Sequence, residues 1–233
     1  MSEESSIEAV GANYSVSAML DTRLRTRRAL RAVADRVEVG MSEHDARALA
    51  RDILEEMGLR RGWHPILVRF GPNTMLQFLD REGGDVTLGA DDIFFVDIGP
   101  VYNGVEGDAG ETFTTGHNPE HLRAASDVLA VWNEVRDAWF YEQRSGRDLY
   151  AFAERACRTR NWRLNLDLTG HRISDYPHKA HFNGAMSTVD IVPSPDLWVL
   201  EIGLAHPDGT FGAFYEDTLL EDQSFDELWP AVT

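Results

Sequence analysis

Five residues with metal-binding side chains lie within or directly after apolar segments of this sequence. Asp97 is part of the segment IFFVDI, Glu201 of WVLEIGL and Glu216 of AFYEDTLL. Asp108 follows Asp97 across a turn that contains glycine, and His171 follows another apolar segment and a glycine. A carboxylate is costly to bury in such surroundings unless it is paired or binds a metal ion. The five residues therefore form a candidate metal site.

The charges of this set suit two divalent metal ions. Four carboxylates carry a charge of about −4, and without cations their repulsion and desolvation would keep some of them protonated. Carboxylate oxygens together with one imidazole suit Mn, Fe, Co or Zn. Two such ions about 3.5–4 Å apart can share a water molecule and lower its pKa, which makes a nucleophile. The five residues together indicate a hydrolase, although any one of them alone could instead form a hydrogen bond that only stabilises the fold.

The segments that must position these residues begin with two helices. We expect one helix over residues 17–39, and a second from Ser42, as its N-cap, to about Gly58. Short apolar runs separated by turns then predict a first group of strands. These strands cover residues 66–70, 93–98, 101–108 and 111–115.

The second half of the sequence has the same plan. One helix is expected from Pro119, with Asn118 as its N-cap, to about residue 143, and another ends near Asn161. The strands that follow cover residues 164–168, 198–204 and 212–220, and residues 176–195 form a loop. The predicted class is α+β, with helices on one face of a largely antiparallel sheet. Residues 1–15 are expected to be a tail and residues 16–233 a single catalytic domain.

Composition excludes several classes of partner. The formal net charge of −17 disfavours nucleic acid and anionic membranes. No apolar run approaches the roughly 20 residues that a membrane span needs, and the N-terminus lacks a signal-peptide pattern. Cys157 is the only cysteine, which rules out an intrachain disulfide. We expect a cytoplasmic protein in which the arginines of the first helix lie on a solvated face.

The same residues resemble the pita-bread metallopeptidase family, which includes methionine aminopeptidase, aminopeptidase P, prolidase and the related creatinase. Residues 96–116, VDIGPVYNGVEGDAGETFTTG, are similar to the first family motif, and residues 170–178, GHRISDYPH, to the second. Glu201 and the segment AFYEDT at residues 213–218 match the remaining two. The resemblance covers roughly residues 18–222 and implies a pita-bread fold, with two pseudo-equivalent halves around a curved sheet.

The resemblance implies a role for each candidate ligand. Asp97 would bind one metal ion, whereas Asp108 and Glu216 would bridge both ions. His171 and Glu201 would complete the second metal position. Glu201 would also be the general base for the bridging water.

Further residues would shape the substrate site if the resemblance holds. His178 matches a histidine that lies near the bond to be cleaved and can donate to the substrate carbonyl. Phe78 occupies the position where the family usually has another histidine. His64 could replace that histidine in space, although its spacing gives no support. Tyr176 and His181 are candidates for the wall of the substrate pocket.

Three functions fit these observations. The first is a two-metal aminopeptidase or dipeptidase, of Xaa-Pro or related specificity, that acts on small peptides. The second is a pita-bread metalloenzyme for a non-peptide small molecule, such as a C–N hydrolase. It is favoured by Phe78, by Lys179 where the family has a carboxylate, and by the expected lack of an N-terminal domain. The third is a binding module without catalysis. The oligomeric state is open, with a homodimer as one option.

Overall fold

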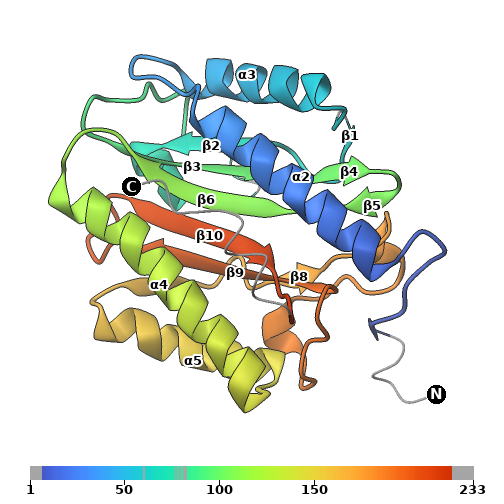
Figure 1. The fold of residues 1–233 in the computed structure, drawn as a ribbon. Helices are drawn as coiled ribbons and strands as arrows, with labels where there is room; N and C mark the ends of the chain where they lie inside the picture. Colours follow the sequence, from blue (N-terminus) through green and yellow to red (C-terminus); the bar gives the residue numbers. More distant parts are fainter. Residues whose placement is uncertain (1–6, 60, 77, 79, 81–82, 222–233) are drawn as a thin grey trace.

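A computed structural model describes residues 7–59, 61–76, 78, 80 and 83–221 of the chain (Figure 1). Residues 1–6 of the expected tail and residues 222–233 of the expected domain lie outside this range. Two helices precede a group of strands in each half of the chain, and the helices cover one face of the main sheet (Figure 1). This arrangement confirms the predicted α+β class.

Each of the four described long helices begins at a serine or asparagine whose side chain accepts a backbone N–H hydrogen bond. The helices are α2 (Val16–Ala34), α3 (Glu43–Glu56), α4 (Pro119–Glu142) and α5 (Gly146–Thr159). Ser42 and Asn118 cap α3 and α4, as the sequence predicts. The first helix ends before the predicted residue 39. Asp35 caps the helix after Ala34, and further along the chain Gly40, with a φ of +90°, donates its backbone N–H to the Leu88 carbonyl.

All described strand pairings are antiparallel. The main sheet has the order β2-β3-β6-β10-β9-β7, with β8 also paired to β9. Its strands are β2 (Leu67–Phe70), β3 (Ile93–Ile98), β6 (Ala109–Thr114), β7 (Arg163–Asn165), β8 (His171–Arg172), β9 (Trp198–Ala205) and β10 (Gly212–Thr218). A smaller sheet has the order β1-β4-β5. Its strands are β1 (Arg61–Gly62), β4 (Pro100–Tyr102) and β5 (Val105–Glu106).

Three short 3-10 helices complete the described elements. They are η1 (Gly71–Met75), η2 (His178–Ala180) and η3 (Met186–Thr188). The first directly follows β2, and the other two lie in the segment predicted as a loop. None of the described helices combines the length and apolarity that a bilayer span requires. The cytoplasmic location stays a prediction.

The two halves of the molecule meet at the neighbouring strands β6 and β10 (Figure 1). Helix α2 packs against β3 and β6, and α3 packs against β2. Helix α4 packs against β9 and β10, and α5 packs on α4. Each half has its own apolar cluster between helices and sheet, and the second cluster contains the buried Trp132, Trp139, Trp162 and Trp198. These cores hold the sheet rigid at the junction of the halves.

Only some of the arginines of α2 lie on the solvated face that the sequence suggests: Arg28 is exposed, whereas others are buried. Arg23 and Arg27 are only 9% and 8% exposed. Arg23 binds the carboxylate of Asp217 with two hydrogen bonds of 2.7 Å, and Arg27 donates to Glu111 at 3.0 Å. The expectation is wrong for Arg23 and Arg27 because Glu111 and Asp217 point toward α2 from the covered face of the sheet. Burying these carboxylates requires cations beside them.

Residues 7–15, which the sequence analysis assigns to a tail, contact the folded chain. Glu8 accepts hydrogen bonds from the Trp198 indole at 2.6 Å and from the Ser194 hydroxyl at 2.6 Å. The backbone N–H of Gly11 donates to Asp175 at 2.7 Å. This segment is therefore bound along the second half of the domain.

Candidate active site

The strand register places three predicted metal ligands in one row across four strands. Asp97 on β3 is aligned with Gly110 on β6, which is aligned with Glu216 on β10. Glu216 is in turn aligned with Glu201 on β9. Residues aligned across neighbouring strands point to the same face of a sheet. A Cβ atom on Gly110 would lie 2.8 Å from Glu216 Oε1, so the glycine leaves room for these carboxylates.

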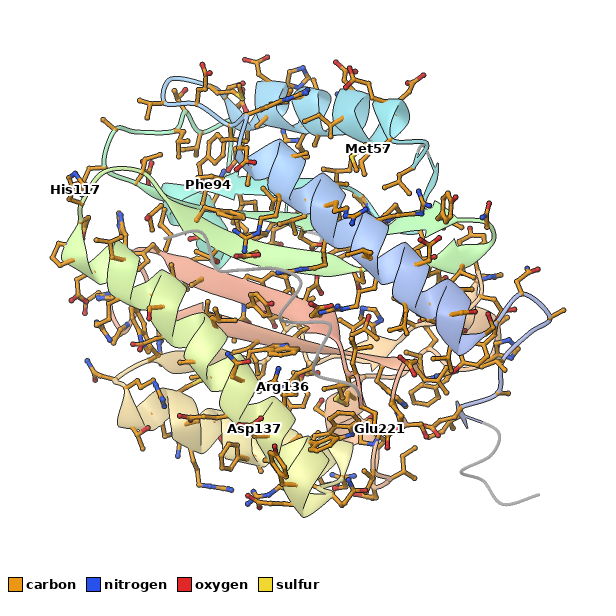
Figure 2. All side chains as sticks on the ribbon, in the orientation of Figure 1. Met57, Phe94, His117, Arg136, Asp137 and Glu221 are labelled. Carbon is orange, nitrogen blue, oxygen red and sulfur yellow. The ribbon has the colours of Figure 1, made fainter. Side chains whose placement is uncertain are left out.

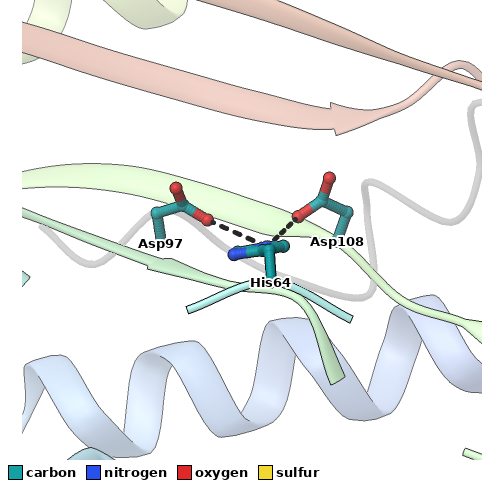
Figure 3. Close-up of side chains that lie close together, drawn as sticks. All are labelled: His64, Asp97 and Asp108. Carbon is teal, nitrogen blue, oxygen red and sulfur yellow. Dashed lines mark hydrogen bonds and ion pairs between the residues drawn. The ribbon is translucent and has the colours of Figure 1, made fainter. Parts of the chain in front are cut away.

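Asp108 lies directly before β6 and is contacted by two histidines. Its Oδ2 atom is 2.9 Å from His171 Nε2, and its Oδ1 atom is 3.2 Å from His64 Nε2. His64 Nε2 also lies 3.5 Å from Asp97 Oδ1, so its ring lies between the two aspartates (Figure 3). His171 Nε2 is 3.9 Å from Glu201 Oε1. The five predicted ligands are thus brought together, with His64 as an addition.

Glu106 holds His178 at the same site. Its Oε2 atom lies 2.6 Å from His178 Nδ1, and its Oε1 atom accepts the His178 backbone N–H at 3.1 Å. The His178 ring stacks with the His171 ring at a centroid distance of 5.5 Å. Because Glu106 binds both the backbone and the ring of His178, it fixes the position of the imidazole.

One cavity of about 340 Å³ contains these groups. The five predicted metal ligands line it, as do His178, His64 and Phe78. Tyr176 and His181 are not among its described lining residues, so the structure does not place these two candidates at the pocket wall.

Burial dominates the electrostatics of the carboxylates. It raises the pKa of Asp97 to about 7, and it also raises the pKa values of Glu201 and Glu216. Asp108 is the exception. Burial acts to raise its pKa as well, but the hydrogen bonds with His171 and His64 outweigh this effect and lower it. The site therefore favours extra positive charge beside its carboxylates.

Neighbouring charges act differently on the three histidines. Burial acts to lower the pKa of His64 and of His171, but the adjacent carboxylates outweigh burial and raise both pKa values to about 9. For His178, burial prevails over the hydrogen bond with Glu106, and its pKa is lowered. His64 and His171 thus supply the positive charge that the carboxylates require when no metal is bound.

The donor atoms fit metal ions. Asp97 Oδ1 and Glu216 Oε1 are buried and accept no hydrogen bond from the described residues, which is costly unless a cation lies beside them. The donor atoms form two groups, and within each group all atoms lie within 4.8 Å of one another. One consists of His64, Asp97 and Asp108, and the other of Asp108, His171 and Glu216. The two groups share Asp108, as a carboxylate that bridges two ions would require.

Sequence reasoning missed Glu106 and did not place His64 among the metal ligands. A signal for Glu106 exists, because it is a second acidic residue only two positions before Asp108, in the segment VEGD. His64 gave no such signal. It follows the two-residue strand β1, whose pairing with β4 brings it to the end of β3. Only that pairing, between segments far apart in sequence, reveals its neighbours.

Comparison with known proteins assigns the chain to a class of hydrolase. The sequence profile of metallopeptidase family M24 matches residues 17–221. The chain therefore belongs to metallopeptidase family M24. This membership confirms the predicted pita-bread family and, at the level of the family, the predicted metal-dependent hydrolase. No curated protein matches the sequence.

Solved structures of this fold superpose well despite low sequence identity. The X-Pro aminopeptidase from Thermotoga maritima has a TM-score of 0.76 at 18% identity, covering 95% of this chain and 62% of that chain. The prolidase from Pyrococcus horikoshii has a TM-score of 0.75 at 14% identity, with coverages of 93% and 62%. The methionine aminopeptidase from Thermotoga maritima has a TM-score of 0.70 at 16% identity, with coverages of 91% and 96%. The chain thus spans 62% of the length of the X-Pro aminopeptidase and of the prolidase.

Proposed function

We propose that this chain is an aminopeptidase or dipeptidase, of Xaa-Pro or related specificity, with two divalent metal ions that share a water molecule. The observation that carries the proposal is the row of buried carboxylates on β3, β10 and β9, beside Asp108 and His171 in one cavity. Mn, Fe, Co and Zn all suit these donors. The names of the superposed aminopeptidases and prolidase support a peptide substrate.

Each predicted ligand has a place in this proposal. Asp97 would help to hold the first ion and His171 and Glu201 the second, and Asp108 and Glu216 would contribute to both positions. Bound ions would supply an acidified water and would polarise the substrate carbonyl.

Glu201 is the proposed general base. Its Oε2 atom accepts the Gly170 backbone N–H at 2.6 Å, which fixes the carboxylate. Burial raises its pKa, so that it can take up a proton closer to neutral pH than an exposed glutamate can.

His178 is the proposed contact to the substrate. Its lowered pKa favours the neutral ring, and its Nδ1–H then donates to Glu106. Nε2 is in that state an acceptor, suited to the N–H of a peptide or of an amino terminus. A donor role toward the carbonyl requires that His178 first gain a proton, and Glu106 would stabilise the resulting charge.

A second candidate function, hydrolysis of a C–N bond in a non-peptide small molecule, rests on Phe78. Its ring lines the cavity 5.7 Å from the centroid of the His64 ring. A phenyl ring cannot donate a hydrogen bond to a peptide carbonyl, whereas the histidine expected there could. Phe78 would favour an apolar group at this wall.

Amino-acid release from Met-x, x-Pro and simple dipeptides by Mn- or Co-loaded protein tests the proposal. Release should vanish in Asp108→Ala and persist in Asp190→Ala, which removes an exposed carboxylate. Bound metal without release from any peptide would contradict the peptidase. If Phe78→His then gained peptide release, the non-peptide function would be favoured for the natural chain.

A further inference from the structure

We propose that His64 is a ligand of the first metal ion, so that each of the two metal positions contains one imidazole. The family resemblance assigns one histidine, His171, to the metal ions and leaves the first ion with carboxylates. The inference rests on the proposed two-metal site and adds a residue to it.

The distances around His64 fit a shared ion. Donor atoms about 2.1 Å from one ion, at angles of about 90–110°, lie about 3.0–3.4 Å from one another. His64 Nε2 lies 3.2 Å from Asp108 Oδ1 and 3.5 Å from Asp97 Oδ1 (Figure 3). Asp97 Oδ1 is buried and accepts no hydrogen bond from the described residues. An ion between these three atoms would satisfy it.

The orientation of the His64 ring is that of a metal ligand. Its Nδ1 lies 2.7 Å from the carbonyl oxygen of Pro65, the next residue in the chain. Nδ1 must carry the proton to donate to this carbonyl, which leaves the Nε2 lone pair directed at the aspartates. Such a hydrogen bond to a backbone carbonyl is typical of histidines that bind metal through the other nitrogen.

His171 has the same arrangement on the other side of Asp108. Its Nδ1 lies 2.6 Å from the carbonyl oxygen of Arg172, again the next residue. Its Nε2 faces Asp108 Oδ2, whereas His64 Nε2 faces Asp108 Oδ1. A bridging carboxylate directs one oxygen to each ion. Each of the two proposed metal positions beside Asp108 therefore contains one imidazole.

The surroundings of His64 are built to hold this ring. Its side chain is only 6% exposed. A Cβ atom on Gly99, directly after β3, would overlap the ring, so glycine is required there. The neighbouring Trp63 packs edge-on against the ring and donates its indole N–H to the Gly107 carbonyl at 2.9 Å. These contacts fix His64 independently of any substrate.

The alternative role for His64 is substrate binding in place of the missing family histidine. That role would leave Nε2 free for the substrate, but both of its described contacts are to proposed metal ligands. An imidazole at the first position also has a chemical consequence. It favours Co or Zn there over Mn, which carboxylates and water suit better.

Cobalt titration monitored by proton NMR tests the inference without an activity assay. A Co(II)-bound imidazole shifts its own Nδ1–H signal far outside the usual range, and that signal disappears in D2O. Wild-type protein should bind two Co(II) ions and give two such signals. His64→Gln should lose one signal and bind the first-position ion at least about 100-fold more weakly, since a ligand should matter at least as much as an outer-shell partner. His117→Gln, which changes an exposed histidine outside the site (Figure 2), should match wild type.

Each outcome decides a separate point. Wild-type protein that binds no Co(II) would overturn the proposed two-metal site and the inference with it. Two bound ions with one shifted signal, or unchanged binding in His64→Gln, would overturn the role of His64 and leave the proposed function intact. His64→Asp should keep both ions and lose one signal, because a carboxylate can replace the ligand but has no N–H. X-ray absorption of the wild type should give about one imidazole per cobalt, which checks the result if a variant does not fold.

Discussion

Asp108 and Asp97 show how differently two buried aspartates of one site can behave. Each oxygen of Asp108 faces an imidazole, and its pKa is lowered although burial alone would raise it. Asp97 has one carboxylate oxygen that accepts no hydrogen bond from the described residues, and burial raises its pKa to about 7. The difference lies in the hydrogen bonds to the charged form, since both groups are buried.

Replacing Glu106 tests how His178 is positioned. In Glu106→Gln the bond to His178 Nδ1 becomes neutral, and the imidazole loses the partner that stabilises its protonated form. We expect kcat to fall by about 10–100-fold, with KM and metal content little changed. Steady-state kinetics beside metal analysis would check this. A loss of metal in the variant would show that Glu106 supports the ligands instead.

Lys179 provides a test of the substrate class. Among the described residues that line the cavity it is the only lysine or arginine, and its ammonium lies 5.9 Å from the centre of the Trp63 ring. It is placed to attract a free carboxylate. In Lys179→Met we expect KM for a dipeptide to rise about 10-fold, the effect of about 1.4 kcal/mol, with kcat unchanged. The matching dipeptide amide, which lacks the carboxylate, should show no rise. Equal effects on both substrates would contradict this role.

At the scale of the elements, the two faces of β6 and β10 contact different parts of the molecule. Glu216 lines the active-site cavity and Gly110 is aligned with it, whereas the next residues along, Glu111 and Asp217, point to α2. The alternation of strand side chains produces this division. Helix α2 therefore neutralises one layer of carboxylates, and the metal ions are proposed to neutralise the other.

The buried pair of Arg23 and Asp217 should contribute strongly to stability. Arg23→Met removes the two hydrogen bonds that Arg23 donates to Asp217, although Arg27 remains 3.6 Å from the carboxylate. The loss should cost about 3 kcal/mol in free energy of unfolding, the lower end of the range for a broken buried pair. Arg25→Met, on the same helix, removes an exposed pair with Asp21 and a contact with the Tyr102 ring, and should cost clearly less. Denaturant unfolding of both variants would compare them. Equal stability of the two would contradict the importance of the buried pair.

At the scale of the whole molecule, the candidate site depends on both halves of the domain. Asp97 and Asp108 come from the first half, and His171, Glu201 and Glu216 come from the second. The two sets meet because β6 pairs with β10. Metal binding would therefore link the halves and stabilise the domain as a unit.

Metal removal should destabilise the chain increasingly as pH rises. Burial raises the pKa of Asp97 to about 7, and carboxylates raise those of His64 and His171 to about 9 against the effect of burial. The folded, metal-free chain thus binds more protons than the unfolded chain from about pH 4 to about pH 9. Its stability should fall across that range, whereas metal binding strengthens as these protons leave. Thermal unfolding with and without chelator should show a Tm gap that widens from pH 5 to pH 8. A gap independent of pH would contradict this account.

Much of the fold could be predicted from sequence because its signals are local. The strand Ile93–Ile98 and the start of α4 at Pro119 agree with the structure, since an apolar run and a capping asparagine act within a few residues. The end of the first helix and the buried face of α2 were not predicted. The buried face depends on a contact with a distant segment, at Asp217.

The sequence by itself determined the family and the set of carboxylates and histidine that could bind metal, because residue type and order along the chain carry that information. Only the tertiary structure decided how these residues are arranged. The register of β6 with β10 aligns Glu216 with Gly110, and the pairing of β1 with β4 brings His64 to Asp108. Tyr176 and His181 show that closeness in sequence is not enough, since they lie near His178 in the chain but are not among the described residues that line the cavity. Distance in space depends on strand pairing between remote segments, which spacing along the chain does not encode.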